Sequence, residues 1–185
     1  MKIKHDNDFW KRKGHEAGNT TKISEKVANF ELDIGLIEGE IAHSELDIIP
    51  WREDELVVFC APSHPFANLD LLSDSDLINA QWILRESGSG TRQAFDFAMH
   101  GLLSQLKVEL ELQHTEAIKR AVESGMGIGC LSRITLEDAF KRGSLIPLKI
   151  PHRNFHRQFY LIMHKSKYRS TGIQNWIDLC LKQRD

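Results

Sequence analysis

The sequence is poor in cysteine, which excludes a fold stapled by disulfide bonds. Its 185 residues include three cysteines, Cys60, Cys130 and Cys180, which lie far apart and are odd in number. Small secreted domains instead carry many cysteines that pair with one another. Each of the three sits among apolar residues, so we expect reduced thiols in or near the core of a cytoplasmic protein.

The sequence also lacks an excess of positive charge and any long apolar run. It has 24 Lys and Arg against 26 Asp and Glu, a net charge of −2. Because DNA binding needs a basic face, we do not expect the chain to bind DNA unaided. No apolar run has the length of a membrane span, and residues 1–17 lack the apolar core of a signal peptide. We therefore expect a cytoplasmic location and no membrane partner.

The apolar residues that are present, 41% of the chain, follow helix and strand patterns in alternation. Ile23, Val27 and Phe30 recur at helical spacing and predict a helix over residues 21–29, whereas the run 55–60 is typical of a strand. Further strands are predicted at 32–37, 46–50, 82–84, 108–112, 128–131, 145–148 and 159–163, and further helices at 91–99, 117–124, 136–141 and 172–181. This alternation predicts an α/β fold with mostly parallel strands.

Residues 82–99, WILRESGSGTRQAFDFAM, combine a buried strand, a small polar loop and an amphipathic helix that starts near Thr91. The first turn of a helix has unpaired N–H groups and the positive end of the helix dipole. Glycines in the loop let a ligand approach the backbone, and the hydroxyls of Ser and Thr can donate hydrogen bonds to it. The stretch therefore fits a carboxylate, sulfate or phosphate. It also fits a plain strand-to-helix connection capped by Ser89 or Thr91.

Three other patterns point away from catalysis, metals and cofactors. The Gly127-Ile128-Gly129 triplet follows a helix, whereas a dinucleotide-binding fingerprint precedes one. His152 and His156 are spaced like metal ligands on a helix, but they lie in a connector without a nearby Cys or acidic partner. No nucleophile elbow and no paired carboxylates are evident. We expect neither an enzyme nor a bound metal or cofactor.

Proline-bearing connectors at residues 61–65 and 147–151 divide the chain into two lobes. A chain that crosses twice between lobes leaves a cleft between them, where ligands usually bind. We expect residues 1–59 and 150–185 to form lobe I and residues 60–149 to form lobe II.

Five segments in order carry a resemblance to a known family: LDIGLIEG at 32–39, LVVFCAPSHP at 56–65, WILRESGSGTR at 82–92, AIKRAVESGMGIGCLS at 117–132 and GSLIPL at 143–148. From residue 18 to residue 185 the sequence resembles the effector-binding domain of LysR-type transcriptional regulators. The resemblance implies a fold like that of the type II periplasmic binding proteins, with two α/β lobes, two hinge crossings and an effector in the cleft. It also implies a helix-turn-helix DNA-binding domain, which has no counterpart in this sequence.

The resemblance further implies the function of sensing a small, anionic metabolite for a bacterial regulator. By motif, the effector-binding residues are Asn19, Thr20, Glu38, Gly39, Ser87, Gly88, Ser89, Gly90, Thr91, Arg92, His114, Thr115, Gly127, Ile128 and Gly129. It implies a homodimer as well, for which the helix over 21–29 and the helix over 117–124 offer candidate surfaces. The family domain normally opens with a strand and an apolar helix that residues 1–17 lack, so we expect the first lobe to be incomplete or altered.

Two other functions fit the same fold. A free-standing solute-binding protein would share the lobes and the cleft, but it would carry a signal peptide. An enzyme on this fold would need a catalytic constellation. A helix-turn-helix encoded upstream of Met1 would distinguish a regulator from a solute-binding protein.

Overall fold

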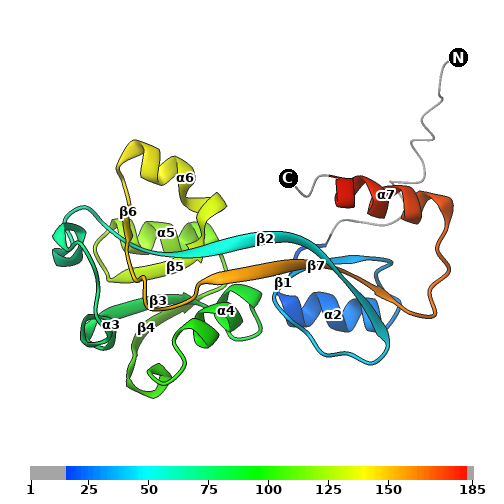
Figure 1. Ribbon diagram of the computed structural model, residues 1–185, viewed down its shortest axis with the longest axis horizontal. Helices are drawn as coiled ribbons and strands as arrows, with labels where there is room; N and C mark the ends of the chain where they lie inside the picture. Colours follow the sequence, from blue (N-terminus) through cyan, green and yellow to red (C-terminus); the bar gives the residue numbers. More distant parts are fainter. Residues whose placement is uncertain (1–15, 183–185) are drawn as a thin grey trace, which may run out of the picture.

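Two long strands, β2 (Leu46–Cys60) and β7 (His156–His164), run side by side and join the two halves of the molecule (Figure 1). They pair antiparallel from Leu46 with His164 to Glu55 with His156. This computed structural model describes residues 16–182, so the expectations for residues 1–15 lie outside the described part. The strand order is β1-β7-β2-β5-β3-β4, with β6 paired to β2.

Lobe I consists of α2 (Thr20–Ala28), β1 (Gly35–Glu38), α7 (Thr171–Lys182) and the adjoining ends of β2 and β7. The helix α2 begins where the Asn19 side chain accepts a hydrogen bond from the Lys22 N–H, as expected for an N-cap. Its apolar face packs on the sheet through Ile23 and Val27, against Ile37 and Ile162.

Lobe II is built around β3 (Gln81–Arg85), which lies between β4 (Lys107–Leu112) and β5 (Ile128–Ser132) and runs parallel to both. Trp82 and Leu84 pack into one hydrophobic cluster and Ile83 into the other, because successive side chains of a strand point to opposite faces. The remaining elements are η1 (Pro65–Asn68), α3 (Asp74–Asn79), α4 (Gly90–Ala98), η2 (Leu103–Gln105), α5 (Thr115–Glu123), α6 (Arg133–Arg142) and β6 (Ile146–Leu148).

The expectation of mostly parallel strands is wrong. Of the six strand pairings in the described part of the chain, four are antiparallel. The reason is that β2 and β7 cross between the lobes and run against their neighbours. The segments 46–50 and 55–60, predicted as separate strands, form the single strand β2, whose register shifts between Pro50 and Arg52.

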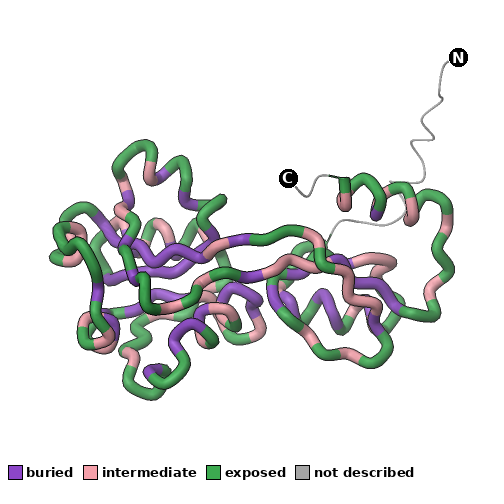
Figure 2. The backbone as a smooth tube through the Cα atoms, in the orientation of Figure 1, coloured by how far each residue is buried: buried purple, intermediate pink, exposed green. Residues whose placement is uncertain are grey.

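The other predicted strands and helices are present, with shifted limits. The strand expected at 32–37 is β1, which begins at Gly35, and the strand expected at 159–163 is β7, which begins at His156. Figure 2 shows that buried residues concentrate in β3, β5 and the adjoining end of β2, whereas Ile177 is the one buried residue of α7. Within residues 16–182, no helix combines the length and the apolar character needed to cross a membrane.

The predicted dimer surface on α2 is wrong in part. Ile23 and Val27 are only 7% and 0% exposed, because they cover the sheet of their own lobe. Phe30 is half-exposed just beyond the helix. A second subunit therefore has no access to Ile23 or Val27.

The contact between α4 and β3 gives a stability prediction. Phe95 is 1% exposed and meets the Trp82 ring edge-on, with 4.9 Å between ring centroids. Phe95→Ala should lower the free energy of unfolding by about 3–5 kcal/mol, because it leaves a cavity in a packed core. Urea denaturation would measure the change. Phe97 on the same helix is 76% exposed, so Phe97→Ala should change stability by about 0.5 kcal/mol or less. Equal losses in the two variants would contradict this packing.

Candidate functional site

The two lobes touch directly at one junction, where the start of α2 faces the loop between β3 and α4. Asn19 Nδ2 donates to Glu86 Oε1 at 3.2 Å. The Thr21 N–H and the Thr21 hydroxyl both donate to the Gly88 carbonyl, at 3.3 and 3.4 Å. These contacts join lobe I directly to lobe II.

Backbone approaches backbone most closely between β1 and α4. A Cβ placed on Gly90 would lie 1.1 Å from the Glu38 carbonyl oxygen, far inside van der Waals contact. The same carbonyl accepts a hydrogen bond from the Thr20 hydroxyl at 3.4 Å. Two residues further along the chain, the Glu40 carbonyl accepts a hydrogen bond from Gln93 Nε2 at 2.9 Å. Only glycine at position 90 permits this contact.

A carboxylate is already held at the N-terminus of α4. Glu38 Oε2 accepts hydrogen bonds from the Thr91 hydroxyl at 3.0 Å and from Arg157 Nη1 at 3.1 Å. Arg157 Nη1 also donates to Thr91 Oγ1 at 2.9 Å. The side chain of Glu38 is 50% exposed, whereas that of Arg157 is 3% exposed. The junction thus holds an anion between a buried cation, a hydroxyl and a helix N-terminus.

The position of Arg157 is fixed by residues of β2 and β7, the two strands that cross between the lobes. Its Nε donates to Asp54 Oδ2 at 2.7 Å, and the Ser132 hydroxyl donates to Asp54 Oδ1 at 2.8 Å. Nη2 lies 2.7 Å from Asp54 Oδ2 as well, but not at an angle that makes a hydrogen bond. It is the one buried side-chain N or O atom in the described part of the chain without a hydrogen-bond partner. The Phe159 ring stacks on the guanidinium, 4.9 Å from Cζ to the centroid.

The polar loop before α4 does not cap the helix through a side chain. Ser89 is the N-cap residue, and its hydroxyl makes no capping hydrogen bond although the residue is buried. The donors of the first turn are therefore not satisfied by Ser89. Gly88 has a φ of 85°, which glycine adopts readily, and the loop turns there to present its carbonyl to α2.

The structure brings together only part of the residue set predicted from the motifs. Asn19, Thr20, Glu38, Gly39, Ser87, Gly88, Ser89, Gly90 and Thr91 belong to the segments that meet at the junction. Arg92 instead binds Asp96 and Glu111, both on lobe II. His114 and Thr115 lie at the start of α5, just after the carboxyl end of β4 and so at the same edge of the sheet as the loop that follows β3.

Gly127, Ile128 and Gly129 are not brought to the junction. They lie at the amino end of β5, where Gly127 approaches the Gln81 carbonyl and Ile128 pairs with Trp82. The junction lies at the carboxyl ends of these parallel strands. The β5 residue at that end is Ser132, which the motif did not indicate.

Arg157, Asp54 and Ser132 are the functional candidates that the sequence motifs missed. A sequence signal exists, since Asp54 and Arg157 are charged residues within strands that also carry apolar runs. Their partnership spans 103 positions of the chain, and a single sequence does not indicate such a pairing.

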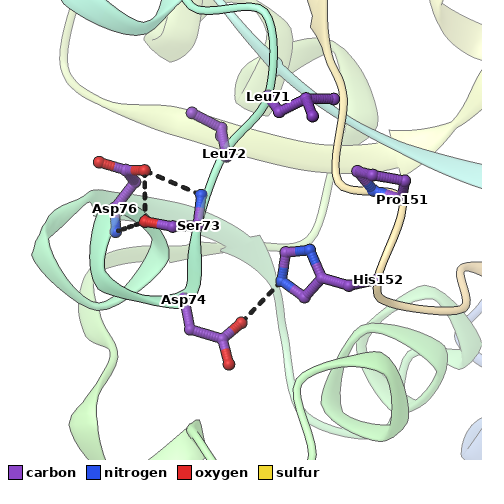
Figure 3. A pocket seen from close by; sticks show the side chains of 7 residues that line it. All are labelled: Leu71, Leu72, Ser73, Asp74, Asp76, Pro151 and His152. Atoms are coloured by element: carbon purple, nitrogen blue, oxygen red, sulfur yellow. Dashed lines mark hydrogen bonds and ion pairs between the residues drawn. The ribbon is translucent and has the colours of Figure 1, made fainter.

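A hollow lies beside α3, which is at the end of lobe II away from β1 and α2 (Figure 1). Figure 3 shows His152 facing Asp74 across it, with the Asp74 Oδ1 to His152 Nε2 distance at 2.8 Å. Arg153 binds both oxygens of Asp74, at 3.0 and 2.8 Å. The hollow is lined by Leu71, Leu72, Ser73, Asp74, Asp76, Pro151 and His152. Because Asp74 already binds Arg153 and Asp76 adds a second carboxylate to the lining, this hollow does not suit an anionic ligand.

Metal and thiol chemistry have little support in the described residues. Between residues 16 and 182, no group of three or more His, Cys, Asp or Glu side chains is arranged to hold a metal ion. Cys60, Cys130 and Cys180 are free thiols. Burial raises the pKa of Cys60 to about 11 and also raises the pKa of Cys130, which keeps both protonated and unreactive near neutral pH.

Comparisons with known proteins agree with the geometry of two lobes around a junction. The family model of the LysR substrate binding domain matches residues 16–185. The HTH-type transcriptional regulator YeiE of Escherichia coli K12 is 40% identical over 163 residues, which cover 88% of this chain and 55% of YeiE. The chain thus spans about half the length of the curated relatives it matches.

Two solved structures show the same fold. The CcmR regulatory domain of Synechocystis PCC6803, in complex with 2-PG, superposes with a TM-score of 0.79 at 31% identity, covering 89% of this chain and 79% of that one. The effector-binding domain of QuiR, in complex with shikimate, has a TM-score of 0.79 at 23% identity, covering 89% of this chain and 78% of that one. The prediction of a fold like the type II periplasmic binding proteins is confirmed.

Gly90→Ala should open the junction. The added methyl group would overlap the Glu38 carbonyl, so the lobes must separate and lose the neighbouring contacts of Asn19 and Thr21. Small-angle X-ray scattering should show a larger radius of gyration than for the wild-type chain. Gly18→Ala is the matched control, because its Cβ would meet ordinary contacts at 3.5 Å. An unchanged radius in Gly90→Ala would contradict a closed junction.

Asp74 gives a prediction for acid stability. Hydrogen bonds from Arg153 and then from His152 lower the pKa of Asp74 from 3.8 to about 2. A carboxyl whose pKa is lowered by folding stabilises the fold above its unfolded pKa, and this contribution disappears as the pH falls from about 3.8 to about 2. The stability difference between wild type and Asp74→Asn should therefore shrink across that range. Urea denaturation at each pH would measure it, with the exposed Asp70→Asn as control. A difference that is constant with pH would contradict the ion pair.

Proposed function

Because this chain belongs to the family of LysR substrate binding domains, we propose that it binds a small anionic effector at the junction of its lobes. The observation that carries the proposal is the carboxylate already held by Thr91 and Arg157 at the N-terminus of α4. A group of donors that binds one carboxylate has the charge and geometry to bind another. The 2-PG complex of CcmR supports a small-molecule ligand in the family.

The proposed binding residues come from both lobes. Thr91 and Arg157 would bind the anionic group, and the first-turn N–H groups of α4 would add donors. Around them we place the junction residues Asn19, Thr20, Glu38, Gly39, Ser87, Gly88, Ser89 and Gly90. Arg92 is left out, because two carboxylates of lobe II already bind it.

The role of the whole protein is also a proposal. As in the HTH-type regulators to which the chain is similar, a helix-turn-helix domain outside the present sequence would bind DNA, and effector binding here would control transcription. We propose a homodimer in the cytoplasm. The lobes meet where residues 53–55 of β2 pair with residues 156–158 of β7, and not at the expected limits 59/60 and 149/150, because residues 56–60 pair with β5 and β6 of lobe II and Ile150 packs in its core. The family consists of transcriptional regulators, so we propose that the domain binds its effector without transforming it.

Thr91→Val tests the anion site. The variant keeps the shape of the side chain but removes the hydroxyl that meets Glu38 and Arg157. Calorimetric titration of the intact chain with sulfate, phosphate and small carboxylates should find a ligand, whose binding Thr91→Val weakens by about 1–3 kcal/mol, the effect of a lost hydrogen bond to a charged group. Thr171→Val, on the exposed first turn of α7, is the control. A ligand bound equally well by Thr91→Val would remove Thr91 from the site.

A further inference from the structure

We propose that Glu38 is an internal competitor of the effector: its carboxylate occupies the anion position in the empty domain, and the effector displaces it. This inference rests on the proposed function, since it concerns the same junction. It sets an affinity threshold, because only an anion that binds Thr91 and Arg157 more strongly than Glu38 does can replace it.

The first argument comes from the two carboxylates that share Arg157. Asp54 has a side chain that is 1% exposed and is held in addition by Ser132, whereas the Glu38 side chain is 50% exposed. Moving Asp54 away would leave the buried guanidinium of Arg157 without its counterion, which is strongly unfavourable. Glu38 can turn into water and regain its hydration. Arg157 therefore has one permanent partner and one exchangeable partner.

The second argument comes from the backbone of Glu38. Its carbonyl is fixed between the Thr20 hydroxyl and Gly90, so the main chain at this point is part of the lobe contact. The side chain can rotate away while the backbone stays in place, because its own torsions are free at a half-exposed site. Exchange of one carboxylate for another anion therefore keeps the backbone contact between the lobes, although it breaks the side-chain bond between Glu38 and Thr91.

The third argument concerns how the lobes are linked. The Glu38 side chain belongs to lobe I and its partner Thr91 to lobe II, so the bond between them crosses the junction. An anion that displaces Glu38 from Thr91 removes this crossing bond and must supply its own contacts to both lobes. The free energy of binding is then the difference between the free energy of the new bonds and that of the bonds that Glu38 loses. Glu38 therefore lowers the affinity for every anion.

Glu38→Gln tests the inference, because it keeps the size of the side chain and removes its charge. With inorganic sulfate as the probe and ionic strength held constant with chloride, calorimetry on the whole chain should show binding about tenfold tighter than wild type, as expected when a bond to a charged group no longer competes. Glu40→Gln is the matched control. It makes the same charge change two residues away, and the lobe contact of Glu40 is through its backbone oxygen. Its affinity should stay within about twofold of wild type.

Two results would overturn the inference. Sulfate binding that is equal or weaker in Glu38→Gln would make Glu38 a bystander or a direct ligand contact, and an equal gain in Glu40→Gln would reveal a general charge effect. If wild type binds sulfate and Thr91→Val abolishes binding, while Glu38→Gln changes nothing, the anion site stands and the competitor role falls. If neither wild type nor Glu38→Gln binds any anion, both ideas fall.

A second measurement avoids dependence on any variant. In carbon-13 spectra of the wild-type chain, saturating sulfate should move the side-chain carboxyl resonance of Glu38 toward that of an exposed glutamate. The Asp54 carboxyl resonance should stay close to its starting value, because Asp54 does not leave Arg157. A Glu38 resonance that does not respond to bound sulfate would contradict displacement.

Discussion

The buried ion pair between Arg157 and Asp54 is the interaction on which the site depends. A guanidinium withdrawn from water is stable only with a partner in good geometry, and here the partner lies on the neighbouring hinge strand. The pair fixes the position of the cation at the point where both lobes meet. The guanidinium of Arg157 has five N–H donors, and Asp54 accepts a hydrogen bond from the one on Nε. Donors therefore remain for a second anion. The Glu38 carboxylate of lobe I takes that position, and the Thr91 hydroxyl of lobe II binds both Glu38 and Arg157.

Small side chains allow the lobes to close around this ion pair. Gly90 lets the start of α4 reach the end of β1, and without it the helix dipole and the Thr91 hydroxyl would be held away from Glu38. Electrostatic attraction falls with distance and with access of water, so contact between the lobes strengthens each bond in the junction. Packing and charge therefore act together, and neither alone makes an anion site.

Local features of the fold could be predicted from the sequence, and long-range partnerships could not. The strand, polar loop and helix over 82–99 were recognisable because their periodicity and their glycines act over a few residues. The partnership of Asp54 with Arg157 depends on how two strands lie in space. The motif assigns the Gly127–Gly129 triplet to the effector site although it lies at the amino end of β5, because a motif gives order along the chain and not the edge of a sheet. The antiparallel hinge was missed for the same reason.

The paired hinge strands determine what kind of motion the domain can make. Between Glu53 and Glu55, β2 has only β7 beside it in the described part of the chain. A hinge made of flexible loops bends freely, whereas a two-stranded ribbon keeps its ladder of hydrogen bonds and yields most easily by twisting about its long axis. The lobes should therefore rotate relative to each other about the long axis of the β2–β7 ribbon. Such a rotation would shear the junction sideways, and a ligand would be admitted by a small angle of twist rather than by a wide opening.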